Sequence, residues 1–230
     1  MIVSINQPAY LPWLGYFDRI AKSDLHIVLD HVQFEKNSMI NRNKLRTSQG
    51  WSWLTVPISS SGKFGDLEIN QLRIAKDSRW QKKHWNSILA NYSKAPYFQQ
   101  HKPFFEAIFS ENWENLDSLL SKVNGYLMQV LGITTKILKS SEMNPAASKS
   151  ELILELCIKS GANTYLSGPQ GRNYLELNQF KANGITVQFQ EYKHPEYRQL
   201  HGDFLPFMSV IDLLFNEGPS SFNVLTGVLP

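Results

Sequence analysis

Apolar and polar positions near the N-terminus follow the order of a parallel α/β unit. Residues 1–6 form a short apolar run, residues 7–15 are rich in turn formers, residues 16–22 have helical spacing, and residues 25–30 are apolar again. Apolar runs of this length between turn residues are typical of buried strands. The loop that follows the first strand leaves the sheet at its carboxyl end, where open α/β sheets bind ligands.

A second unit of the same kind lies towards the C-terminus. Strands are predicted at residues 164–166 and 185–192, with a helix at 174–183 between them. The two units and the helices between them predict an α/β, Rossmann-like fold: a largely parallel sheet with flanking helices and a helical middle segment. Because the first strand is apolar and feeds a crossover helix, we expect it at or near the centre of the sheet.

The middle of the chain has the apolar spacing of helices. One helix is predicted to start after the candidate caps Asp77 and Ser78 and to stop before Pro96. The longest amphipathic segment is at residues 113–131, and Gly132 is placed to end it.

Further elements are predicted on either side of these helices. Residues 31–49 are polar, whereas residues 51–58 and 133–138 have the composition of strands. Ser148 begins a capping box for a helix that Gly161 is placed to end.

Length and composition limit the class of protein. We expect a single domain over residues 1–230, with room for a helical subdomain at 77–131. The net charge of +3 is small and the basic residues are spread thinly, which argues against nucleic-acid binding. Cys157 is the only cysteine, so no disulfide forms within the chain, and no metal site is expected. No segment approaches membrane-spanning length. These features predict a soluble, cytoplasmic protein without direct membrane insertion, and they indicate no particular cofactor or oligomeric state.

Aromatic and polar side chains crowd the loop after the first strand, where Gln7, Tyr10 and Trp13 occur. Large rings with a polar tip line small-molecule pockets, so these residues are candidates for substrate binding. The structural alternative is an aromatic turn that holds the first helix against the sheet. The sequence has no Walker loop, G-x-G-x-x-G, G-x-S-x-G or H-E-x-x-H motif, so it carries no generic catalytic signature.

Short motifs extend over nearly the whole chain. They are QPAYLPWLGYF (7–17), DHVQF (30–34), NRN (41–43), LTVP (54–57), KH (83–84), KAPYF (94–98), YLSGP (165–169), HPEY (194–197) and SVIDLLFN (209–216). Together and in this order they resemble the WbqC-like family. The resemblance implies a role in the assembly of O-antigen or other surface polysaccharides, with transfer of glycine or another acyl group to an amino sugar as a suggested activity.

Histidines and a carboxylate are the candidates for acid–base catalysis. His194 lies in a loop just beyond a predicted strand, and this position favours function. His84 has apolar neighbours one helical turn away, so a buried structural histidine is the alternative there. A histidine beside a carboxylate can deprotonate an attacking amine, and Asp30, at the end of a strand, is the preferred carboxylate.

Polar residues on other loops are candidates for substrate binding. Arg42, between Asn41 and Asn43 and downstream of Gln33, offers a planar fork of donors suited to phosphate or carboxylate. A surface salt bridge is the alternative for Arg42.

Two segments near the second unit complete the predicted site. Ser167 and Gly168, which precede Pro169 and a helix, resemble an anion-binding turn. The alternative is a tight turn whose glycine meets a backbone requirement. Tyr197 and Gln199 are placed to orient an acceptor beside His194.

Three classes of function follow. The first is a transferase that acts on a nucleotide-activated or lipid-linked amino sugar as its small-molecule substrate. The second is an adenylating enzyme, because residues 13–16 are placed like the H-x-G-H motif of nucleotidylyl-transfer folds, although Trp13 and Tyr16 replace both histidines. The third is a non-catalytic protein that binds a sugar or a partner. Convergence of the candidate residues on one concavity would favour an enzyme, and scattered positions would favour the third class.

Overall fold

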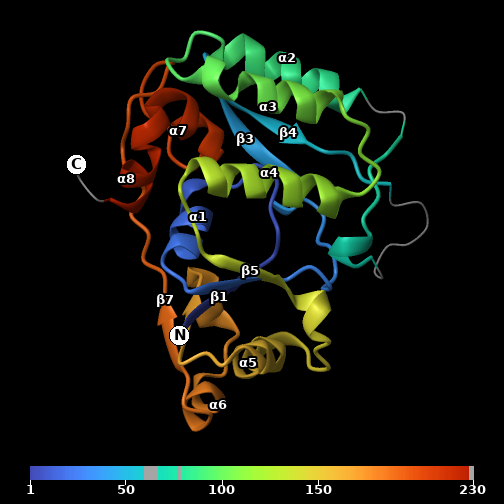
Figure 1. Cartoon of the computed structure of the whole chain (residues 1–230), viewed down its shortest axis with the longest axis vertical. Helices are drawn as coiled ribbons and strands as arrows, with labels where there is room; N and C mark the ends of the chain where they lie inside the picture. Colours follow the sequence, from blue (N-terminus) through green and yellow to red (C-terminus); the bar gives the residue numbers. More distant parts are fainter. Residues whose placement is uncertain (60–66, 77–78, 228–230) are drawn as a thin grey trace.

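The computed structural model describes residues 1–59, 67–76 and 79–227. Its centre is a five-stranded sheet with the order β5-β2-β1-β6-β7, in which every neighbouring pair is parallel. These strands are β1 (Ile2–Asn6), β2 (Leu25–Val28), β5 (Lys136–Lys139), β6 (Thr164–Ser167) and β7 (Thr186–Phe189). Figure 1 labels the two edge strands of the sheet, β5 and β7, and its middle strand, β1. The α/β class and the parallel sheet are thus confirmed, and β1 is the middle strand, as predicted.

The chain builds the sheet outward from β1 in two directions. The helix α1 (Leu14–Ala21) leads to β2, and β5 extends that side. The helix α5 (Lys149–Ser160) then returns the chain to β6 on the other side of β1, and α6 (Leu177–Ala182) leads to β7. The order therefore reverses between β1 and β6, as in a Rossmann-like sheet. Ligands of such folds bind outside the carboxyl ends of the strands at this switch point.

Helices cover both faces of the sheet (Figure 1). The larger hydrophobic core contains α1 and α4 (Leu116–Val130), whereas the second core contains α5 and α6. Alternate residues of β2 face the two sides, as strand geometry requires. Leu25 and Ile27 pack in the second core, and His26 and Val28 line a cavity beside α4.

The segment between β2 and β5 adds a hairpin and helices to the face of the sheet that α1 and α4 cover. The antiparallel hairpin consists of β3 (Arg42–Thr47) and β4 (Gly50–Thr55). The helices α2 (Trp80–Tyr92) and α3 (Phe98–Ser110) pack on each other, and α7 (Val210–Glu217) packs on α3 (Figure 1). All of them share the larger core with α1. The remaining short elements are η1 (Ile69–Gln71), η2 (Ser140–Met143), η3 (Pro169–Asn173), η4 (Gly218–Ser220) and α8 (Ser221–Thr226).

Ile133 closes α4 instead of opening the next strand. Gly132 has a φ of +70°, its N–H donates to the carbonyl of Gln129 (3.1 Å), and the N–H of Ile133 donates to the carbonyl of Met128 (2.9 Å). This is a Schellman arrangement, in which a left-handed glycine ends a helix. The predicted end at Gly132 is confirmed. The predicted strand was placed too early, because β5 begins only at Lys136.

The sequence pattern misses β3 because two of its three buried residues are polar, and Leu45 is the apolar one. Asn43 and Arg46 are buried. The Asn43 amide donates to the carbonyl of Leu11 (2.7 Å), and the Arg46 guanidinium donates to the carbonyl of Gly50 (2.7 Å). Hydrogen bonds therefore allow burial at these positions, and a search for alternating apolar residues cannot detect such a strand.

Predicted helix ends are matched in part. Ser148 occupies the N-cap of α5, but its side chain accepts no hydrogen bond from the helix. Gly161 ends α5 with a φ of +72°, and α2 ends before Pro96, both as predicted. The predicted caps Asp77 and Ser78 lie outside the described residues. Both α6 and β7 are shorter than predicted. Among the described residues, no helix combines the length and apolar character needed to cross a bilayer.

Candidate active site

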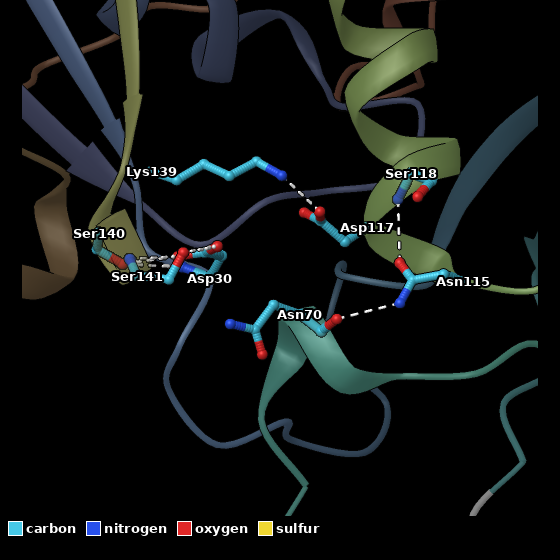
Figure 2. Close-up of polar contacts among 8 residues, drawn as sticks. All are labelled: Asp30, Asn70, Asn115, Asp117, Ser118, Lys139, Ser140 and Ser141. Atoms are coloured by element: carbon cyan, nitrogen blue, oxygen red, sulfur yellow. Dashed lines mark hydrogen bonds and ion pairs between the residues drawn. The ribbon is translucent and has the colours of Figure 1, made fainter. Parts of the chain in front are cut away.

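Polar side chains gather where β2 and β5 end, at the carboxyl edge of the sheet (Figure 2). The members of this sheet-edge cluster come from the ends of two strands, from two short helices and from the first turn of α4. They are Asp30, Asn70, Asp117, Lys139 and Ser141. Segments far apart in the sequence thus bring two carboxylates, an amide, a hydroxyl and an ammonium group to an edge where parallel α/β sheets bind ligands.

Asp30 connects the segments of this edge. Its side chain is buried, with Oδ1 accepting hydrogen bonds from Ser140 Oγ and the Ser141 N–H (2.9 Å each) and Oδ2 accepting from Ser141 Oγ (2.7 Å). The Asn70 N–H donates to the Asp30 carbonyl (2.8 Å). Both carboxylate oxygens are thus engaged by the protein. The predicted strand was too long, because β2 ends at Val28 and Asp30 lies two residues beyond it at the carboxyl edge of the sheet. Its catalytic role stays a prediction.

Lys139 and Asp117 form an ion pair across the cluster, with Nζ and Oδ2 2.5 Å apart (Figure 2). The two side chains are 32% and 14% exposed, so both remain accessible to a ligand. Asp117 lies in the first turn of α4, where the helix dipole favours a negative charge. Among the described residues, no group of three or more His, Cys, Asp or Glu side chains is arranged to hold a metal ion.

A cavity of about 350 Å³, here called the α4 cavity, lies between α4 and the sheet. Its wall includes Tyr16, His26 and Asn124, together with Asp117 and Lys139. The volume is in the usual range of small-molecule sites. Because Asp117 and Lys139 belong both to this wall and to the sheet-edge cluster, the cavity and the cluster form one candidate site.

His26 contributes a neutral imidazole to the cavity wall. Its Nδ1 lies 2.8 Å from Ser4 Oγ, and its ring contacts the Tyr16 ring edge to face. Burial lowers the pKa of His26 to about 3, and the positive charge of Arg19 acts in the same direction. The Nε2 atom is buried and finds no hydrogen-bond partner among the described residues. Sequence reasoning missed this residue, although a histidine within an otherwise apolar strand is a detectable signal.

Asn124 adds a second unpaired atom to the same wall. Its Nδ2 donates to the carbonyl of Ala9 (3.1 Å), whereas its Oδ1 is buried and finds no partner in the described part of the chain. A buried polar atom without a hydrogen bond costs about 1–3 kcal/mol.

The structure places Tyr10 and His84 in the hydrophobic core. Tyr10 Oη lies 2.9 Å from His84 Nδ1, and the His84 ring packs against Trp80. Burial lowers the pKa of His84 to about 4. This geometry is that of the structural alternative for His84, and neither residue lines the α4 cavity.

His194 lies in a separate aromatic cluster. The half-buried ring contacts Phe204 and Phe207, its Nδ1 lies 2.8 Å from the carbonyl of Pro195, and burial lowers its pKa. Its Nε2 is buried and has no partner among the described residues. His194 does not line the α4 cavity, so its predicted role as a base stays a prediction.

Tyr197 and Gln199 serve a buried carboxylate. Each donates a 2.8 Å hydrogen bond to Asp212 Oδ2, and Tyr92 donates to Asp212 Oδ1 (2.7 Å). Burial raises the pKa of Asp212, and these three donors oppose that shift. The network joins the loop after β7 to α2 and α7. Asp212 is therefore the structural partner of Tyr197 and Gln199. That these two residues orient an acceptor stays a prediction.

Arg42 and Asn41 line a different, more open pocket of about 300 Å³. The Arg42 guanidinium stacks on the Trp53 ring at 4.3 Å, and its Nη1 donates to Asn37 Oδ1 (3.3 Å). Asn41 Nδ2 donates to a backbone carbonyl (2.8 Å). The neighbouring Asn43, which is also part of β3, is buried, and Gln33 is exposed.

The remaining predicted residues lie at other strand ends. Gln7 is half-buried directly after β1, and Trp13 packs on Tyr192 and Phe207. Ser167 is buried at the end of β6, next to Gly168. The predicted residues therefore do not converge on one concavity, and this outcome favours the non-catalytic class over an enzyme built from them. The α4 cavity, which contains none of the predicted site residues, is the candidate for a catalytic site.

Comparison with known proteins agrees with the sequence motifs. The model of the WbqC-like protein family matches residues 7–224. The chain is also similar to an uncharacterized protein of Mycobacterium tuberculosis, with 37% identity over 218 residues that make up 94% of this chain and 94% of the relative. No solved structure matches the chain. The family match includes the whole α4 cavity and sheet-edge cluster.

Proposed function

Because the chain belongs to the WbqC-like protein family, we propose that it is a transferase of surface-polysaccharide biosynthesis that moves glycine or another acyl group onto an amino sugar. The observation that carries the proposal is the α4 cavity, whose wall holds a neutral histidine beside an accessible ion pair. The polysaccharide role comes from the family resemblance. Donors such as acyl-CoA, ATP and nucleotide sugars are cytoplasmic metabolites, so the proposal also places the protein in the cytoplasm.

Each group of the site has a defined task in this reaction. The amine nitrogen of the sugar attacks the acyl carbon, the bond to the leaving group breaks, and the proton that the amine loses passes to the departing group. Asp117 accepts a hydrogen bond from the amine, and the Lys139 ammonium stabilises the negative charge that develops on the acyl oxygen. His26 and Asn124 form part of the cavity wall that orients the sugar.

A transfer assay tests the proposal. The acceptor is UDP-glucosamine, which has a free amine, and the donors are acetyl-CoA or glycine with ATP. Mass spectrometry should detect an acceptor that carries one additional acyl group. A product that requires ATP would favour the adenylating alternative, and binding of the sugar without a product would favour the non-catalytic alternative.

Two lysines of β5 provide a matched pair of variants. Lys139 ends the strand at the α4 cavity, whereas Lys136 begins it, is exposed and does not line the cavity. Lys139→Met should lower product formation by about 10²–10³-fold, the range for loss of a group that stabilises developing charge. Lys136→Met should leave it unchanged. Equal activities of the two variants would contradict the proposed site.

A further inference from the structure

Arg19 is a buried cation that the site described above does not use. It lies in the last turn of α1 and is 7% exposed, and its Nε is fully buried. Within the described residues, no side chain or carbonyl accepts a hydrogen bond from its guanidinium, and none forms an ion pair with it. The adjacent Asp18 is engaged elsewhere, by Lys22 (2.8 Å) and by Gln190 (2.8 Å).

An unpaired buried guanidinium needs a physical explanation. Burial lowers the pKa of Arg19, but arginine stays protonated near neutral pH, so the positive charge is retained. Burying a charge without a partner costs several kcal/mol, and most buried donors in proteins are satisfied. A bound anion would remove that cost by accepting the hydrogen bonds of the guanidinium.

Gly168 leaves room for this guanidinium at the carboxyl end of β6. A β-carbon at Gly168 would lie 2.2 Å from Arg19 Nη1. The backbone of Gly168 has φ −68° and ψ 164°, which any residue can adopt, so the glycine meets no backbone requirement. Its role is therefore the close approach of Arg19. The contact lies where β6 adjoins β1, which is the switch point of the sheet.

Three tyrosines lie near Arg19. Tyr165, Tyr16 and Tyr174 are close enough to raise its pKa, against the effect of burial. Tyr16 and Tyr165 are buried, whereas Tyr174 is 50% exposed and marks the side that is open to solvent. Tyr16 also lines the α4 cavity, so the two regions adjoin.

We infer that Arg19 and the Gly168 turn form a binding site for the phosphate group of a mono- or diphosphate. The planar guanidinium can donate two parallel hydrogen bonds to phosphate oxygens, and the tyrosine hydroxyls can donate to the others. The site deepens the earlier expectation for the Ser167–Gly168 turn by naming the cation that binds the anion. It does not depend on acyl transfer, because it requires only binding.

The test is isothermal titration with sodium pyrophosphate and inorganic phosphate, with sodium acetate at equal ionic strength as the carboxylate comparison. The unmodified chain should bind a phosphate probe and not acetate. Arg19→Met and Gly168→Ala should each weaken that binding about 10- to 100-fold. Arg172→Met is the matched control, since Arg172 lies in the same turn but is half exposed and pairs with Glu191 (3.1 Å).

Each outcome decides the inference. Arg19→Met should keep or raise the melting temperature, because an apolar chain of similar length replaces an unpaired buried charge. If that variant does not fold, Gly168→Ala decides alone, as it retains the charge and only occupies its space. The site would be overturned if Arg19→Met and Gly168→Ala both bind phosphate as well as Arg172→Met does. It would also be overturned if the unmodified chain binds neither phosphate probe. Phosphate binding without acyl transfer would leave it standing while removing the transferase proposal.

Discussion

His26 Nδ1 lies 2.8 Å from Ser4 Oγ, and the parallel register of β1 and β2 places these two residues directly opposite each other. The contact fixes the imidazole ring of a residue that lines the α4 cavity. Two central strands of the sheet thereby orient one polar group at the bottom of the candidate site. A group held on strands is positioned more rigidly than one on a loop, as a substrate-orienting group requires.

Turnover should depend on His26 more than on His194. In His26→Leu the cavity wall loses its imidazole, so kcat/KM for the acceptor should fall about 10-fold, which corresponds to one hydrogen bond. His194→Gln, in the separate aromatic cluster, is the comparison and should retain activity. A loss of about 10²–10⁴-fold in His194→Gln with intact folding would instead identify His194 as the general base.

Stability should decrease between pH 7 and pH 5. Burial lowers the pKa of His26 to about 3 and that of His84 to about 4, from an ordinary value of 6.5. The unfolded chain therefore binds protons below pH 6.5 that the folded chain excludes, so acid favours unfolding. Each histidine should contribute up to about 1.4 kcal/mol per pH unit. Urea unfolding at the two pH values measures this.

The pH effect has its own control. In His84→Met the contribution of one histidine disappears, so the free energy of unfolding should vary less steeply with pH than in the unmodified chain. Identical slopes for the two proteins would show that His84 is protonated normally in the folded state.

Asp30 should be required for stability. Asp30→Ala leaves Ser140 and Ser141 without the acceptor that joins η2 to the end of β2, and loss of such buried hydrogen bonds costs about 2–4 kcal/mol. The midpoint of urea unfolding measures this, with the exposed Glu35→Ala as control. Unchanged stability together with lost turnover would make Asp30 catalytic, as its strand-end position predicts.

The fold can be predicted from the sequence where a whole strand is buried on both faces. Strands covered on both faces are apolar, which is why β1 and its central place are predictable. The prediction fails where another interaction replaces that pattern. Ile133 is apolar because it closes α4. Two of the three buried residues of β3, Asn43 and Arg46, are polar and are held by hydrogen bonds.

The candidate site is less predictable because its parts meet only in the folded chain. Asp117 begins α4 and Lys139 ends β5, so no local spacing links them. Tyr10 illustrates the opposite case. Its loop is correctly placed after β1, but only the packing of α2 shows that its hydroxyl pairs with His84 in the core.

The most direct test fills the α4 cavity. Gly125 lies on its wall in α4, and a β-carbon there would meet no atom within 4 Å. Gly125→Ala should stabilise the helix by about 1 kcal/mol and leave the cavity open. Gly125→Phe should keep the fold and obstruct the cavity. The measurement is kcat/KM for the amino-sugar acceptor. We predict that Gly125→Ala matches the unmodified chain and that Gly125→Phe falls about 100-fold. Equal values for the two variants would contradict a substrate site in the α4 cavity.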